Sequence, residues 1–346
     1  MLVPVVLQSC VDPILFETDP GERELVFYGN FTQLNENHIF TISRTSDFGK
    51  PVIPVTGASV VIKDDQGSCA DYEEFESGRY ELAADKIQGI PGRSYHIEIT
   101  FTNGKVYYST PQVMPEPIAV EEIYHTIESR QILSSSDILV DKTFIDVFID
   151  TPLQNSSGET SRFRWTVDEV YSFTDIQCGL FDFAETCYFN DPPDVSEVLL
   201  FENKDRTQKY LRGFKVRSRF LVPFDEFTGR HYFIVNQYTI SKEIFEYWDK
   251  INIVANQSGS LFDRQPARVS GNIFEKDNEQ VLVLGYFEVN GQNVLRTFIT
   301  PNQIKPFQSI FTCVDITFFI DHREECCNCS AKRGNQIGRP EYWDAD

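Results

Sequence analysis

Apolar and polar residues alternate with a period of two through much of the first third of the chain, and turn signals separate the runs. Such alternation is typical of β-strands with one buried face. Asn103-Gly104 is a strong signal for a two-residue hairpin. The pattern predicts an immunoglobulin-like or transthyretin-like sandwich over residues 24–111. Its expected strands are Leu25–Phe31, His38–Ser43, Ala58–Lys63, Tyr72–Phe75, Arg79–Leu82, Tyr95–Thr102 and Lys105–Ser109.

The segment from Pro111 to Pro117 interrupts this pattern with three prolines. Proline fixes φ and lacks an N–H donor, so it favours extended backbone and ends pairing inside a sheet. We therefore predict a linker at residues 112–118 between two domains.

Longer strand signals follow, and they predict a larger antiparallel β-domain over residues 119–346 with a cysteine-rich C-terminal tail. Asn290-Gly291 predicts a hairpin between two of these strands. One helix is expected at about 242–255, with Ser241 as its N-cap. Its apolar stripe, which includes Trp248, predicts that the helix packs on a sheet and that Trp248 is a core residue rather than a sugar platform. The expected strands are Ala119–Ile127, Thr143–Ile149, Arg162–Phe173, Val198–Glu202, Gly213–Val222, Tyr232–Thr239, Val281–Val289 and Val294–Ile299.

The first ten residues resemble a bacterial lipobox. A short apolar run precedes Leu7-Gln8-Ser9-Cys10, in which a small residue stands before the cysteine. In such sequences the cysteine becomes the lipid-carrying N-terminus, so we expect lipidation at Cys10 and a signal remnant at 1–9. Residues 10–23 then form an acidic tether. The alternative is a buried first strand that ends in cysteine.

The other seven cysteines fit an exported, oxidised protein. Cys69 stands alone in the first domain and is the expected free thiol. The remaining six are disulfide candidates with open connectivity: Cys178, Cys187, Cys313, Cys326, Cys327 and Cys329. A weaker alternative is a zinc site formed by Cys326 and Cys329 with Cys313 and His322.

Composition narrows the function classes. The formal charge of −21 makes nucleic-acid binding improbable. The sequence contains no nucleophile elbow, zinc-protease motif, P-loop or dinucleotide-binding turn, and no cofactor is expected. Adjacent carboxylates such as Asp168-Glu169 are ordinary in so acidic a chain. They leave a glycosidase as a minor alternative.

Several separate stretches together resemble a family of uncharacterised Bacteroidota outer-membrane lipoproteins known as a domain of unknown function. They are Cys10–Pro13, Ser43–Gly49, Ile90–Tyr95, Tyr247-Trp248, Val269–Ile273, Gly285–Phe287, Cys326–Cys329 and Arg339–Trp343. The resemblance implies a non-enzymatic, lipid-anchored outer-membrane protein on the cell surface that assists a TonB-dependent nutrient receptor as an accessory or lid subunit. The alternative location is the periplasmic face of the outer membrane. The alternative is a stand-alone surface module that binds carbohydrate or peptide, which the 14% aromatic content also suits.

Overall fold

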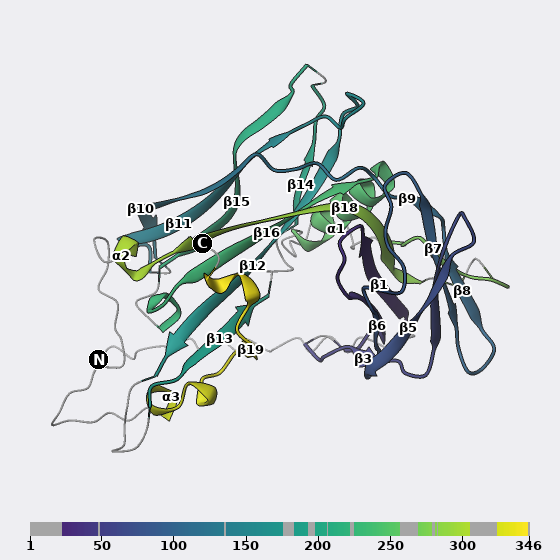
Figure 1. Ribbon diagram of the computed structural model, residues 1–346, viewed down its shortest axis with the longest axis horizontal. Coiled ribbons are helices and arrows are strands. Elements are labelled where there is room, and N and C mark those ends of the chain that lie inside the picture. The colour runs from purple at the N-terminus through teal and green to yellow at the C-terminus, as the bar shows by residue number, and fades with distance from the viewer. Residues whose placement is uncertain are drawn as a thin grey trace, which may run out of the picture.

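The computed structural model describes residues 23–47, 49–134, 136–175, 183–192, 198–205, 207–221, 225–256, 269–278, 281, 283–304 and 324–344. Strands predominate, and they form two β-modules that lie side by side (Figure 1). None of the helices in these ranges has the length and apolarity that crossing a membrane requires. The predicted mostly β architecture is confirmed: a sandwich is followed by a larger β-domain with one packed helix and a disulfide-bonded tail.

The first module is a sheet folded back on itself. β5 (Cys69–Glu76) makes the fold, because its first residues pair with β4 (Ser59–Asp64) and its last residues pair with β6 (Arg79–Leu82). The two layers enclose fully buried aromatic rings, among them Phe27 and Tyr95. The other strands of this part are β1 (Leu25–Thr32), β2 (His38–Arg44), β3 (Ile53–Pro54), β7 (Ser94–Thr100), β8 (Val106–Ser109) and β9 (Gln112–Val113).

The second module packs two sheets face to face. The smaller sheet has the order β10-β11-β15, and the larger contains β18, β16, β12 and β13, with β14 and β19 at its margin. Its core lies between the sheets and includes Trp165, Phe233 and Val147. The strands are β10 (Glu122–Leu133), β11 (Leu139–Pro152), β12 (Arg162–Thr174), β13 (Thr186–Asp191), β14 (Leu199–Glu202), β15 (Tyr210–Phe220), β16 (His231–Ile240), β18 (Leu284–Ile299) and β19 (Asn335–Ile337).

The long strand β18 belongs to both modules. Residues 284–290 pair in parallel with β1, and residues 291–299 pair antiparallel with β16. The hairpin predicted at Asn290-Gly291 is therefore wrong, since both residues lie inside one strand. A Cβ at Gly291 would lie 2.6 Å from the Pro115 carbonyl oxygen, so this glycine permits a close crossing of the chain rather than a turn.

The crossing also changes the predicted domain organisation. β17 (Ile273–Glu275) pairs with β8, and Ile273 and Phe287 are part of the first module's core. Residues 24–111 therefore do not complete their sandwich alone. The expected linker at 112–118 is packed: Gln112–Val113 pair with β7, and Ile118 is buried in the second core.

Helix α1 (Lys242–Ala255) begins as predicted, since the Ser241 hydroxyl accepts a hydrogen bond from the Ile244 N–H. Ile244 and Tyr247 are buried against Tyr286 of β18, and Trp248 packs beside them. The remaining short helices are α2 (Pro301–Ile304), α3 (Glu324–Cys327), η1 (Asp225–Phe227), η2 (Cys329–Ala331) and η3 (Glu341–Asp344).

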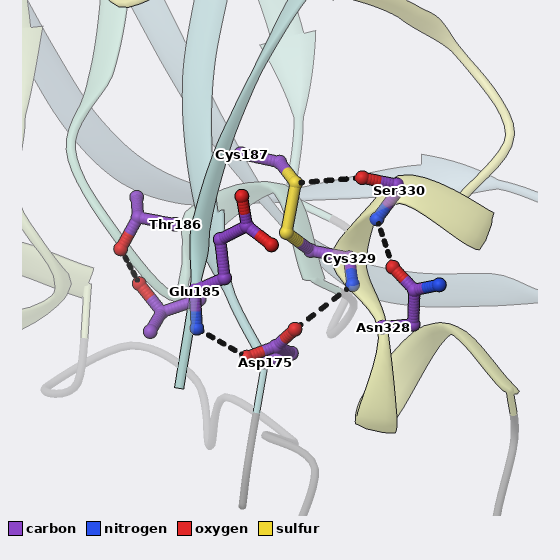
Figure 2. The surroundings of a disulfide bond; sticks show 8 residues. Asp175, Glu185, Thr186, Cys187, Asn328, Cys329 and Ser330 are labelled. Atoms are coloured by element: carbon purple, nitrogen blue, oxygen red, sulfur yellow. Dashed lines mark hydrogen bonds between the residues drawn. A yellow bond between two sulfur atoms is a disulfide. The ribbon is translucent and has the colours of Figure 1, made fainter. Parts of the chain in front are cut away.

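The C-terminal tail is fixed to the outer part of the large sheet. A disulfide joins Cys187 on β13 to Cys329, and the Asp175 carboxylate accepts hydrogen bonds from the Cys329 and Glu185 N–H groups (Figure 2). Trp343 then packs on Tyr232 with ring centroids 4.8 Å apart. This covalent and aromatic attachment orders a segment that has little strand periodicity of its own.

Candidate binding clefts at the module junction

A buried ion pair lies at the centre of the junction between the modules. Arg164 on β12 donates to Glu288 on β18 at 3.2 Å, and the Glu288 side chain is fully buried. The guanidinium lies between the rings of Tyr238 and Trp248, 4.6 and 4.7 Å from their centroids. The Trp248 indole also donates to Glu288 at 2.9 Å. Trp248 is half-buried and packs against a core cluster, as the predicted packing of the helix requires, and it ties α1 to the strand that both modules share.

The burial of this pair needs several compensating contacts. Asn290 donates to Glu288 Oε2, the oxygen that also accepts from Arg164, at 2.8 Å, and to Asn30 of β1 at 2.9 Å. A buried charge destabilises the fold unless it is paired and hydrogen-bonded, so these contacts set the relative position of β1, β12 and β18. Burial, followed by the negative charge of Glu288, raises the pKa of the nearby Tyr28 hydroxyl, which stays neutral.

The first cleft opens where the segment 114–116 passes the second module. It has a volume of about 480 Å³. Its walls come from Pro91 and Gly92 of the first module and from 159–162 and 239–241 of the second. The Glu116 carboxylate on its wall accepts a hydrogen bond from the Ser156 hydroxyl at 2.7 Å. Both modules therefore shape this cleft.

The second cleft adjoins the first and shares residues 159–162 with it. It has a volume of about 670 Å³ and a wall that includes the Arg162–Glu202 ion pair, at 2.8 Å. Asn203 also lines it and is only 5% exposed. Its amide donates to the Gln208 carbonyl, but its Oδ1 accepts no hydrogen bond within the described ranges. An unused buried acceptor is suited to a donor from a polar ligand.

The third cleft involves Pro117, Ala119 and residues from both modules, and its volume is about 670 Å³. Gln33 of the first module exchanges two hydrogen bonds with the backbone of Gln292 at its wall, at 2.6 and 2.9 Å. Glu36 lines the same cleft, and burial raises the pKa of its carboxyl. Hydrogen bonds hold residues in the walls of all three clefts, and the lining of the second cleft is mainly polar.

A second charged network lies between the sheets of the second module. Glu169 of β12 is almost fully buried and contacts His231 at 2.8 Å and Arg217 at 2.7 Å; Arg219 bonds it as well. Burial raises the pKa of Glu169, but the His231 hydrogen bond and the arginine charges outweigh this and lower it to about 2. The imidazole of His231 lies on the Phe227 ring at 4.5 Å. Because Glu169 has several charged or hydrogen-bonding partners, this network is suited to a structural role.

Neither network is predicted from the sequence. Asp168-Glu169 is expected there to be ordinary acid in an acidic chain, and neither Arg164 nor Glu288 is singled out. The available signal is a charge inside an apolar strand run, as in Tyr286-Phe287-Glu288-Val289. That signal cannot identify the partner, which lies 124 residues away for Arg164 and Glu288.

The cysteine predictions have mixed outcomes. Cys187 and Cys329 are joined, and Cys326 and Cys327 are also disulfide-bonded. A sulfur in a disulfide is not a thiolate ligand, so the zinc alternative through Cys326 and Cys329 is wrong; within the described ranges no group of residues is arranged to hold a metal ion. Cys69 is free and exposed, as expected. Other predicted residues lie outside the described residues: Cys10, Cys178, Cys313 and His322.

Comparisons with known proteins place the chain in a family but give it no activity. No curated protein matches it. Among solved structures, a biofilm-associated protein BSP domain aligns with 6% identity and a TM-score of 0.13, covering 79% of this chain. The chain spans 59% of that structure's length, and so low a score carries no argument. A family model described as a domain of unknown function, DUF4249, matches residues 11–295. The protein therefore belongs to the DUF4249 family.

Proposed function

We propose that this protein is a non-enzymatic lipoprotein of the bacterial outer membrane, anchored through Cys10, that serves as an accessory or lid subunit of a TonB-dependent nutrient receptor. In this proposal the lipid holds the chain at the outer membrane, on the cell surface. The two β-modules then present the junction clefts to the receptor or to its nutrient.

The observation that carries the proposal is the disulfide bonding of the tail. Cys187 is joined to Cys329, and two neighbouring cysteines are also oxidised. Disulfides persist outside the reducing cytosol, and the same export route is required for lipidation of a lipobox cysteine. The free thiol at Cys69 is compatible with this compartment because seven cysteines remain once Cys10 carries lipid.

The junction clefts support a binding role. Ligand sites commonly lie where two rigid units meet, and here both modules contribute walls to the first and third clefts. The carboxylates that line the first two clefts already have partners: Ser156 for Glu116, Asn155 for Glu159 and Arg162 for Glu202. Because these carboxylates are already paired, the clefts are suited to a ligand that is recognised by its shape and by hydrogen bonds rather than by its charge.

The test is expression of the chain, with any sequence that precedes it in its gene, in a Bacteroidota host supplied with an alkyne-labelled fatty acid. We expect label on the wild-type protein and none on Cys10→Ala. Detergent extraction and affinity purification should then recover a TonB-dependent receptor in near-stoichiometric amount. An unlabelled protein found in the cytosol would contradict the anchoring, and a labelled protein that purifies without a barrel would contradict the receptor role.

The second candidate is a stand-alone module that binds carbohydrate or peptide. The unused acceptor of Asn203 in the second cleft favours it, because sugars and peptide backbones both supply N–H or O–H donors. Glycan and peptide arrays with the purified protein would detect such binding. Asn203→Leu should abolish it, whereas Gln66→Leu on the exposed surface of the first module should leave it unchanged.

A further inference from the structure

Among the residues that the structure describes, one edge of β10 is unpaired over most of its length. It pairs with β11 in unbroken register from Glu122–Asp150 to Leu133–Leu139, and within the described part of the chain it pairs with no other strand. Its beginning is held against β18, where the Val120 N–H donates to Asn293, and His125 bonds Thr297 at 3.1 Å. Beyond His125, from Thr126 to Leu133, the edge carries backbone donors and acceptors that pair with no neighbouring strand in the described ranges. We call residues 126–133 the β10 edge.

The opposite edge of the same sheet is interrupted. The pairing of β15 with β11 shifts register twice, between Val147 and Phe148 and again between Ile149 and Thr151. Gly213 in β15 has a φ of +62°. Irregularities of this kind protect a sheet edge from pairing with other chains. The β10 edge contains neither proline nor bulge, so the sheet is protected on one side only.

The β10 edge ends in an apolar tip. Leu133, Ile138 and Leu139 are 65%, 62% and 62% exposed, and Ile132 lies beside them at 36%. Two hydrogen bonds close the end of the hairpin: the Ser134 N–H donates to the Ile138 carbonyl, and the Ser134 hydroxyl accepts from the Ile138 N–H. Clustered exposed aliphatic residues are typical of an interaction surface.

Contacts between side chains order the stem behind the tip. Arg130 lies over the Phe144 ring at 4.3 Å and is paired with the buried carboxylate of Asp146 at 2.6 Å. Across the ladder, the Ser129 and Thr143 hydroxyls are hydrogen-bonded at 3.0 Å. A preordered edge loses little conformational entropy when a further strand is added.

We propose that the β10 edge binds an extended segment of a partner protein, which adds a fourth strand to the β10-β11-β15 sheet. Backbone hydrogen bonds supply affinity in this mode of recognition, and alternate side chains supply specificity. One face of the added strand lies beside Ile127 and Leu133 and takes apolar residues. Its other face lies beside Glu128, whose side chain is 55% exposed although Arg130 lies 3.2 Å from its carboxylate, and takes a basic residue there. The partner segment is thus an alternating apolar and basic strand.

A foreign strand fits this edge better than a second copy of the chain. Two copies, each with a formal charge of −21, repel one another. The two-fold register that sets Glu128 opposite Arg130 also sets the apolar Leu133 opposite His125. A basic strand avoids both penalties. The proposal does not depend on the partner's being a barrel receptor.

The test measures hydrogen–deuterium exchange of the full chain with and without a synthetic octapeptide, blocked at both ends, in which Val alternates with Lys and Thr. We expect the peptide to slow amide exchange within residues 126–133. Its twin, N-methylated at alternate residues, has the same charge but cannot donate from one edge, and should give no protection. Ile132→Lys with Leu133→Lys should weaken binding by about tenfold or more, whereas Val52→Lys, at a residue 61% exposed in the first module, should not.

Charge reversal provides the sharpest criterion. Glu128→Lys should weaken binding of the Lys peptide and strengthen binding of a peptide with Glu in place of Lys. Equal binding of both peptides to both proteins would overturn the proposal, as would protection outside residues 126–133. Concentration-dependent protection of the β10 edge without peptide would show a second copy there and would also overturn it. None of these outcomes depends on lipidation or on a receptor, so they are separate from the test of the proposed function.

Discussion

Single residues at the junction make contacts that the sequence pattern does not predict. Glu288 lies in an apolar run, yet it is the acceptor that Arg164, Trp248 and Asn290 share. Removing one member of such a buried set leaves an unpaired charge, which commonly destabilises a protein by ~3–5 kcal/mol. Asn290 and Gly291 show the same limit. This pair signals a turn, yet both residues lie inside β18 and contact distant segments.

Gly291→Ala tests the close crossing. The added methyl group would lie 2.6 Å from the Pro115 carbonyl oxygen and 2.7 Å from the Pro117 nitrogen, both backbone atoms. We expect the free energy of unfolding in urea to fall by ~1–3 kcal/mol. Gly338→Ala is the matched control, because within the described ranges no atom beyond its chain neighbours lies within 4 Å of the place that its methyl group would take, and its φ is ordinary. Equal effects of the two substitutions would contradict the crossing.

His38 tests pH dependence. Burial lowers its pKa to about 4, although a hydrogen bond between the imidazole and the Leu34 backbone opposes the shift. The unfolded chain binds the proton near pH 6.5 and the folded chain only near pH 4, so acidification favours unfolding. Stability should fall by about 2–3 kcal/mol between pH 6.5 and 4. His38→Phe should lose this part of the slope, and urea unfolding of both proteins at several pH values measures the difference.

At the scale of elements, the sequence predicts most of what local chemistry determines. The alternating strands of the first module and the Ser241-capped helix follow from periodicity and capping. β13 and β19 are not predicted, because β19 is only Asn335–Ile337 and is paired to β13 near a disulfide-bonded tail. The candidate clefts are not predictable at all, since they depend on where separate segments meet.

Removal of one disulfide tests the attachment of the tail. Cys187→Ser combined with Cys329→Ser opens a connection between residues 142 positions apart. We expect the free energy of unfolding to fall by about 2 kcal/mol, near the lower end for such bonds, because Cys326 and Cys327 keep their own disulfides. Cys69→Ser, at the exposed free thiol, should have no effect. If protease cleaved the tail at the same rate in the wild-type protein, the double variant and Cys69→Ser, that result would contradict this attachment.

At the scale of the whole molecule, β18 makes two modules into one unit. It pairs with β1 in its first half and with β16 in its second, and the Arg164–Glu288 pair lies beside the change of partner. A unit that shares a central strand cannot lose one half without exposing the core of the other. We therefore expect the modules to unfold in a single cooperative transition.

The three tryptophans and Cys69 allow this expectation to be checked. Trp165, Trp248 and Trp343 are in the second module, so tryptophan fluorescence reports its unfolding. A dye on Cys69, in β5, reports the first module in a Cys10→Ser protein. The two signals should give the same urea midpoint. Separate midpoints would mean that β18 joins the modules without coupling them. In that case Glu288→Gln should shift only the tryptophan transition, whereas in a coupled molecule it shifts both by the same amount.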